Sequence, residues 1–205
     1  MLTSARGLRK PGRRPAILLG AAVLAALIGS GASGDPGEAL GQLMQRLAAR
    51  RHGHATFVER QFLAILDRPL ESSGELFYDA PDRLEKRTLA PKPESLLLEH
   101  GVLNVRHRGR SYRLSLGDYP QLAPFVDSVR ATLAGDLPAL EQAYELSFES
   151  TAADWALVLV PREAQLATLI ARIRISGAGD LVREVTVERA DGDRSVMTIS
   201  AVPGT

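Results

Sequence analysis

Polar and apolar residues alternate along two long stretches of the chain, and this alternation constrains the fold more than any other feature. The stretches run from residue 55 to residue 116 and from residue 144 to residue 201. Within the first, residues 72–101 form three short alternating runs that Pro and Gly residues separate. Alternation predicts strands that bury one face, and the short turns between them predict antiparallel pairing. We therefore expect about ten antiparallel strands.

Helical spacing replaces the alternation before the first stretch and between the two. Residues 37–51 predict an amphipathic helix, and residues 119–133 and 137–142 predict a helical pair. The apolar stripes consist of Leu40, Leu43, Met44 and Leu47 in the first helix and of Leu122, Phe125, Val126, Val129 and Leu133 in the second. Because the pair is inserted between two blocks of strands, its stripe must lie on the sheet.

The first 32 residues have the order of a secretory signal peptide. Five basic residues and no acidic one precede the apolar run Ala16–Ile28, and small residues follow it. The apolar run is shorter than the roughly 20 residues that a transmembrane helix needs, which makes an uncleaved anchor the less favoured alternative. We expect residues 1–32 to be a signal peptide and residues 33–205 to form a single domain.

The leader also dominates the charge of the chain. The whole chain has 25 basic and 24 acidic residues, so removal of the five basic leader residues leaves a net charge of −4. No basic field then remains to favour nucleic acid as a partner. The chain has no Cys, so an exported domain must hold its core without disulfides.

The sequence offers no clear catalytic constellation. It has no G-x-S-x-G nucleophile elbow, and His52-x-His54 supplies only half of a metal site. Carboxylates are plentiful but scattered, which leaves a glycosidase-like pair open as a minor alternative. Arg108, Arg110 and Arg113 cluster at a turn, either as a solvated hairpin tip or as a contact for an anionic surface. We expect binding rather than catalysis, with no metal and no cofactor.

The helical pair allows two interpretations. A curled sheet with an apolar inner face and an amphipathic helical cover can enclose a pocket for an apolar ligand. The plainer alternative is that the stripe of the pair fills an ordinary core, and the pattern alone favours that alternative.

Short motifs along the chain resemble those of the LolA-type periplasmic lipoprotein carriers. The matching positions are Phe57 with Gln61, the run Gly74–Tyr78 with Pro81, and the run Glu94–Gly101. The order of helix, strand, strand pair and hairpin is also similar over most of the chain after the leader. The runs Pro81–Lys86 and Arg130–Asp136 most resemble a divergent LolA-related branch.

The resemblance implies an α+β fold: an open, strongly curved antiparallel half-barrel with an N-terminal helix and an inserted helical lid over an apolar cavity. It implies a periplasmic protein without enzyme activity that binds acyl chains of lipoproteins, or free lipid. Such a carrier takes its cargo from an inner-membrane exporter to an outer-membrane acceptor, and we expect it to be a monomer. The expected cavity and lid residues are Leu76, Tyr78, Leu84, Leu97, Leu114, Leu122, Phe125, Val129 and Leu133.

The chain departs from the main branch of carriers around Pro81. Those carriers typically have an Arg directly before the Pro that matches Pro81, and that Arg latches the lid; here the residue is Ala80. They also usually have an aromatic residue two to five positions after that Pro, where this chain has the run Arg83–Lys86. Lipoprotein, free fatty acyl, polyene and glycolipid cargo therefore all stay open. Two other functions also stay open: a periplasmic lipid or lipoprotein sensor or scaffold on the same fold, and a hydrolase with a scattered acidic site.

Overall fold

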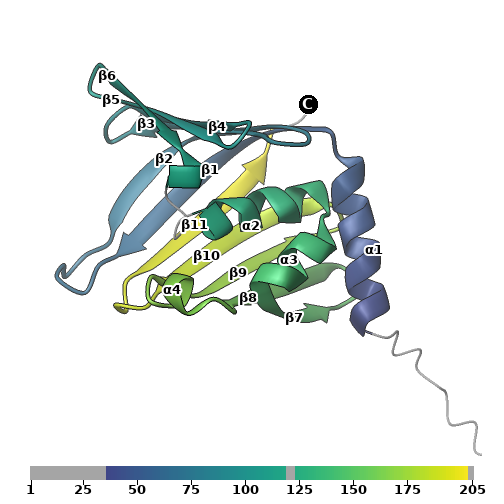
Figure 1. Ribbon diagram of the computed structural model, residues 1–205. Helices are drawn as coiled ribbons and strands as arrows, with labels where there is room; N and C mark the ends of the chain where they lie inside the picture. The colour runs from purple at the N-terminus through teal and green to yellow at the C-terminus, as the bar shows by residue number, and fades with distance from the viewer. Residues whose placement is uncertain (1–35, 119–122, 203–205) are drawn as a thin grey trace, which may run out of the picture. The chain divides into compact units, whose positions relative to one another are not determined.

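The computed structural model describes residues 36–118 and 123–202 (Figure 1). Residues Gly34–Thr205 group into one compact unit. The expected signal peptide, residues 1–32, lies outside the described residues. The helices are α1 Pro36–Ala49, α2 Ala123–Ala134, α3 Leu137–Ala143 and the short α4 Ala164–Ala167. The strands are β1 His52–Phe62, β2 Leu70–Asp79, β3 Arg83–Ala90, β4 Glu94–Glu99, β5 Val102–His107, β6 Arg110–Ser115, β7 Tyr144–Ser150, β8 Asp154–Pro161, β9 Ile170–Ala178, β10 Leu181–Arg189 and β11 Arg194–Ala201.

All eleven strands form one antiparallel sheet with the order β6-β5-β4-β3-β2-β1-β11-β10-β9-β8-β7. Strands β1 to β6 pair with their neighbours in the chain, and so do strands β7 to β11. The two meanders join through a single non-local pairing of β1 with β11, in which Phe57 lies opposite Ile199. The sheet stays open, because β6 and β7 form its two edges. The predicted α+β fold with an open, curved antiparallel sheet is confirmed.

The strand order explains why a helical pair covers the sheet. The chain leaves the sheet at one edge, β6, and re-enters it at the other edge, β7. In a curved sheet the short path between the edges crosses the concave side, and α2 and α3 lie on that path (Figure 1). Because α2 is amphipathic, it turns its apolar side toward the strands.

The filled core of the protein lies on the C-terminal meander. Leu43 and Leu47 of α1 and Leu140 of α3 are buried in one cluster with Leu157 and Ile173 of the sheet. Asp136 caps α3, since its Oδ1 accepts a hydrogen bond from the Ala139 backbone N at 3.2 Å. These contacts fix α1 and α3 against β7 to β9 and leave α2 to cover the rest of the concave face.

Gly135 joins α1 to the end of α2 at very close range. Its φ of +67° is a conformation that residues with a side chain rarely adopt. A Cβ at this position would lie 2.2 Å from the backbone O of Met44 in α1. The absence of a side chain at Gly135 therefore allows the two helices to pack directly against each other.

Two boundaries differ from the sequence-based expectation. β1 begins at His52, three residues before the alternating stretch that starts at residue 55, because His52 pairs with Asp79 and Gly53 pairs with Tyr78 of β2. The second alternating stretch also contains α4, a single helical turn just before β9 that buries Leu166. The two segments 55–116 and 144–201 otherwise contain the strands that their alternation predicts.

Candidate binding cavity

A cavity of about 460 Å³ lies between the concave face of the sheet and the apolar side of α2. Strands β2 to β5 supply one wall, strands β9 to β11 supply the other, and α2 closes the space between them. The apolar lining residues are Leu47, Ala55, Leu76, Phe77, Tyr78, Leu84, Leu96, Leu98, Leu103, Val126, Val129, Leu133, Ile175, Leu181, Val182, Val185, Val187, Met197, Ile199 and Ala201.

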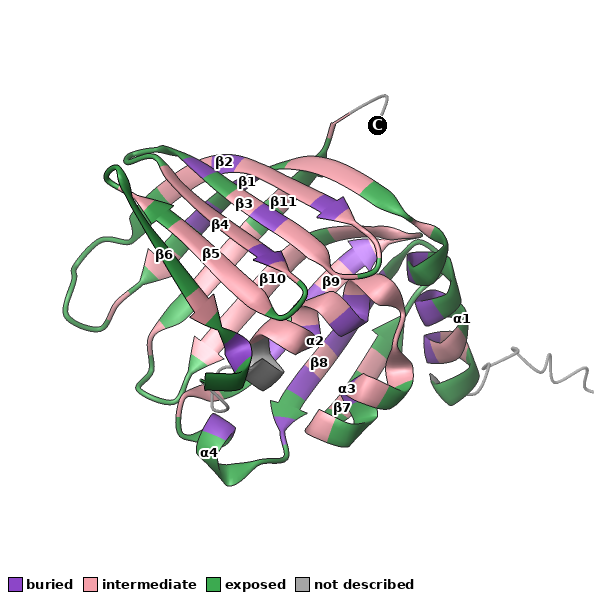
Figure 2. Ribbon diagram, turned by 45° about the horizontal axis from the view of Figure 1, so that its top comes forward, coloured by how far each residue is buried: buried purple, intermediate pink, exposed green. Residues whose placement is uncertain are grey.

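Strand alternation makes this lining apolar. Leu76, Leu84 and Leu96 follow one another across β2, β3 and β4, with Leu84 opposite Tyr78 and with Leu96 opposite Lys86. Cross-strand partners share a face, so these leucines line the same wall. They are only half-buried, whereas Leu157 and Leu159 of the core have no exposed surface. Figure 2 shows intermediate burial along most of strands β2 to β5. The N-terminal half of the concave face is therefore apolar but only partly filled.

A small polar cluster interrupts the apolar lining. Lys86 Nζ donates a hydrogen bond to Glu59 Oε2 at 2.5 Å, and Ser195 Oγ donates to Glu59 Oε1 at 2.6 Å. The Lys86 ammonium also lies 4.9 Å from the centre of the Phe57 ring. Burial raises the pKa of Glu59, but the bonds from Lys86 and Ser195 outweigh it and hold that pKa below its ordinary value. The Glu59 carboxylate is thus ionised and paired.

Tyr78 carries a second polar group beside the cavity. Its side chain is 93% buried, since only 7% of its surface is exposed, and its hydroxyl has no hydrogen-bond partner among the described residues. Burial raises the pKa of this hydroxyl, so it is neutral at physiological pH. A buried hydroxyl without a partner costs free energy that a phenyl ring would not.

Most of the predicted cavity and lid residues whose side chains the structure describes lie together. Leu76, Tyr78, Leu84, Val129 and Leu133 all line the cavity. Their role in binding a ligand stays a prediction.

The remaining four predicted residues lie elsewhere or outside the description. Leu97 lines a groove on the opposite face, because Leu96 and Leu98 occupy the inward positions of β4. Leu114, in β6, lies opposite Leu103 of β5 but is not among the residues that line the cavity. Leu122 lies outside the described residues, and of Phe125 only the backbone, in α2, is described.

Sequence reasoning missed the polar cluster and the whole second wall. Glu59 is two residues from Phe57 in an alternating strand, so the inward position of an acid was visible in the sequence. Its partners were not visible, because Lys86 comes from β3 and Ser195 from β11. The wall formed by Val185, Val187 and Met197 depends on the pairing of β1 with β11.

Ala80, at the position of the lid latch in the main branch of carriers, contributes a backbone hydrogen bond here. Its N donates a hydrogen bond to the backbone O of Arg51 at 2.8 Å. Arg50 at the rim of the cavity donates to Asp180 Oδ2 at 3.1 Å, which ties the end of α1 to the turn before β10. The close α1–α2 contact at Gly135 also holds α2 against α1.

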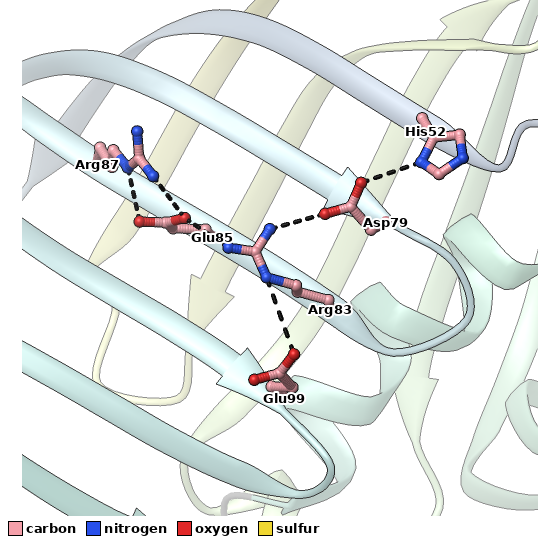
Figure 3. A network of polar contacts seen from close by, with 6 residues as sticks. All are labelled: His52, Asp79, Arg83, Glu85, Arg87 and Glu99. Atoms are coloured by element: carbon pink, nitrogen blue, oxygen red, sulfur yellow. Dashed lines mark hydrogen bonds and ion pairs between the residues drawn. The ribbon is translucent and has the colours of Figure 1, made fainter.

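The outer face of the sheet carries an ion-pair network that spans strands β1 to β4. Arg83 donates to Asp79 at 2.7 Å and to Glu85 at 3.1 Å, and Arg87 donates to Glu85 at 2.6 Å. His52 and Glu99 extend this network across β1 to β4 (Figure 3). A groove of about 580 Å³ lies beside it, and four arginines line that groove: Arg83, Arg87, Arg106 and Arg113.

Metal-binding chemistry finds no support in the described part of the chain. No group of three or more His, Asp or Glu side chains there could hold a metal ion. His52 Nδ1 lies 3.0 Å from Asp79 Oδ1, and His54 Nε2 lies 3.2 Å from Glu75 Oε1. Among the described helices, none has the length and the apolar character to span a bilayer.

An open half-barrel with a helical lid over an apolar cavity defines a class of proteins that can enclose an apolar ligand. Residues 31–202 match the family of outer membrane lipoprotein carrier proteins of the LolA-like type, and the chain belongs to this family. The sequence-based resemblance to LolA-type carriers is thereby confirmed. No curated protein matches the chain.

Several solved structures are similar in fold. The LolA superfamily protein NE2245 from Nitrosomonas europaea is 11% identical, covering 78% of this chain and 90% of that one, with a TM-score of 0.41. A putative outer membrane lipoprotein-sorting protein domain from Vibrio parahaemolyticus is 8% identical, covering 83% and 95%, with a TM-score of 0.46. The MucA/MucB complex from Pseudomonas aeruginosa is 16% identical, covering 81% and 59%, with a TM-score of 0.43.

Proposed function

We propose that this protein is a carrier that binds the acyl chains of lipoproteins, or of free lipids, in the cavity beneath α2. The apolar, unfilled concave face is the observation that carries the proposal. Leu76, Leu84 and Leu96 face inward but are only half-buried. Because leucine side chains are apolar, a ligand that covered them would stabilise the protein. Membership of the lipoprotein carrier family supports an acyl chain as the missing partner.

The size of the cavity supports the same class of cargo. Its volume of about 460 Å³ lies within the roughly 300–1,000 Å³ of typical small-molecule sites. Each CH₂ group that leaves water for an apolar wall contributes about 0.8 kcal/mol. A chain of several carbons would therefore bind without any dedicated polar contact, and α2 would shield it from water.

Transport between membranes extends this proposal. An exported protein that shields acyl chains can accept them from an inner-membrane exporter and release them to an outer-membrane acceptor. The signal-peptide pattern of residues 1–32 supports a periplasmic location. α2 covers one side of the cavity, so its movement would widen the path for release to the acceptor.

Hydrolysis receives little support from the acid on the cavity wall. A general acid needs a raised pKa, whereas ion pairing with Lys86 holds the pKa of Glu59 down. Lys86 is itself paired with that carboxylate and is a poor general base for Ser195. The three residues suit the holding of a polar group better than the cleavage of a bond.

A second candidate function is a lipid-responsive scaffold. The groove with four arginines on the outer face offers an anionic partner a surface separate from the cavity. A stable complex with an envelope protein, retained through purification and weakened by Arg106→Ala, would favour the scaffold. Transient contact only, together with exchange of bound lipid between membranes, would favour the carrier.

The proposal is tested on protein purified from cells that express the full chain. Organic extraction followed by mass spectrometry should release lipid in stoichiometric amount, and an apolar fluorophore should bind saturably and be displaced by acyl chains. Protein that carries no lipid and does not bind the fluorophore would contradict the proposal.

A further inference from the structure

The polar cluster within the cavity has a defined position. Glu59 lies on β1, Lys86 on β3 and Ser195 on β11, and all three line the cavity. The cluster therefore faces the cavity from strands near the centre of the sheet. The Lys86 side chain is 24% exposed and the Glu59 side chain 9%, so a ligand reaches the ammonium more readily than the carboxylate.

The bonds within the cluster determine what it can offer a ligand. Both oxygens of Glu59 already accept hydrogen bonds, one from Lys86 and one from Ser195. An ammonium group has three N–H donors, and Lys86 has no second oxygen acceptor among the described residues. The hydroxyl of Ser195 donates its only proton to Glu59. The cluster thus offers donors from Lys86 and an accepting oxygen on Ser195.

The charge of the cluster limits which ligand those donors suit. Glu59 and Lys86 neutralise each other, so a ligand with a neutral polar group adds no charge to the cavity. A free carboxylate would lie near the negative charge of Glu59, whose side chain is only 9% exposed, so water screens the repulsion poorly. A carbonyl oxygen of an ester or amide would accept from Lys86 without that cost.

We propose that Glu59, Lys86 and Ser195 form a polar subsite that accepts the carbonyl group of an ester- or amide-linked acyl chain and disfavours a free fatty acid. The inference rests on the proposed function, since it concerns cargo in the same cavity. Lys86 is the donor, and Glu59 both orients it and excludes carboxylates. The cargo is then an acylated molecule rather than the acid itself.

A purely structural role for the cluster makes a different prediction. The Glu59–Lys86 pair bridges β1 and β3 across β2, and such a tie would stabilise the sheet without any effect on ligand choice. Selectivity between ligands of equal chain length separates the two roles, because a structural tie does not sense the head group of the ligand.

The test compares laurate with its neutral glycerol ester, 1-monolaurin, at pH 7.5 and below their micelle concentrations. Displacement of an apolar fluorophore gives both affinities, and we expect the wild-type protein to bind the ester about tenfold more tightly or better. Glu59→Gln frees Lys86 for the ligand, so laurate should gain about tenfold in affinity and the preference should vanish or reverse. Lys86→Met should weaken the ester selectively.

Glu71→Gln provides the matched control, because Glu71 pairs with Arg60 on exposed positions of β1 and β2. It should leave both affinities unchanged. Equal wild-type affinities for acid and ester would overturn the subsite while leaving the carrier proposal intact. Failure of both ligands to displace the fluorophore would contradict the carrier proposal itself. The wild-type comparison needs no variant, so a poorly folded Glu59→Gln protein would not prevent the decision.

Discussion

The buried hydroxyl of Tyr78 lowers the stability of the fold, and removal of its oxygen atom would end this effect. It is buried and has no hydrogen-bond partner among the described residues. Tyr78→Phe should leave the free energy of unfolding unchanged or raise it by about 1 kcal/mol, since an unsatisfied buried group is removed. Urea denaturation of the purified protein measures this.

Tyr144→Phe is the control for that substitution. Tyr144 is buried as well, but its hydroxyl forms a hydrogen bond with Ser128. Its removal should lower the free energy of unfolding by about 1 kcal/mol. A Tyr78→Phe protein as destabilised as Tyr144→Phe would show that the Tyr78 hydroxyl has a partner in solution.

Individual residues also mark how far sequence reasoning reaches. Alternation in β2 correctly places Leu76 and Tyr78 on one face. In β4 three leucines follow one another, so no alternation tells which of them faces inward. Pairing decides it, because Leu98 lies opposite Leu84 and Leu96 lies opposite Lys86, which leaves Leu97 outside. That pairing depends on turns and registers that a single strand does not encode.

At the scale of elements, α2 decides between a cavity and a core. Val129 lines the cavity and is half-buried. Val129→Asp should keep cooperative unfolding but lower the affinity for an apolar fluorophore about tenfold or more, since a charge then faces the ligand. Circular dichroism and fluorophore titration check the two parts separately.

Leu157→Asp is the contrasting change in the filled core. Leu157 has no exposed surface, and an unpaired charge there should cost several kcal/mol and prevent folding. If Val129→Asp unfolded the protein as Leu157→Asp does, α2 would be an ordinary core helix. That result would contradict the proposal that the cavity beneath α2 binds a ligand.

The junction of α1 and α2 gives a third prediction. Gly135→Ala should destabilise the protein by clearly more than about 1 kcal/mol, because a positive φ and a clash with the Met44 backbone act together. Gly109→Ala is the matched control, since Gly109 has a φ of +75° but open space around it. Thermal unfolding compares the stability of the two variants. Equal losses of stability would show that α1 and α2 move apart easily to accommodate the added methyl group.

The elements themselves were largely visible in the sequence. Residues 37–51 predicted α1, and residues 119–133 predicted the helix observed as α2, Ala123–Ala134. The cavity could not be predicted from the sequence, because an apolar stripe has the same pattern whether it packs into a filled core or lines a cavity. Only the placement of α1 and α3 over β7 to β9 shows which part of the sheet is filled.

The whole molecule should lose stability in acid in a predictable range. Hydrogen bonds from Arg87 hold the pKa of Glu85 below its ordinary value of 4.5, and bonds from His52 and Arg83 lower the pKa of Asp79. A group with a lowered pKa stabilises the fold fully above its unfolded pKa, and this contribution disappears as the pH falls through the folded pKa.

The free energy of unfolding should therefore be nearly constant from neutral pH to about pH 5 and fall below pH 4.5. Glu85→Gln should lower stability at pH 7 and flatten the decline in acid. Glu145→Gln, at an exposed position of β7, should change neither. Urea denaturation at several pH values measures this, and an unchanged acid decline in Glu85→Gln would contradict the role of the network.

The pairing of β1 with β11 limits when the sheet can be completed, because the chain is synthesised from its N-terminus onward. Among the described strands, β11 is synthesised last, yet it lies at the centre of the sheet beside the first. Until it arrives, β1 carries an unpaired edge, and such edges recruit other strands. Pairing across so much intervening chain is also intrinsically slow. Newly made protein thus has a built-in interval of aggregation risk, which ends only when residues 194–201 are in place.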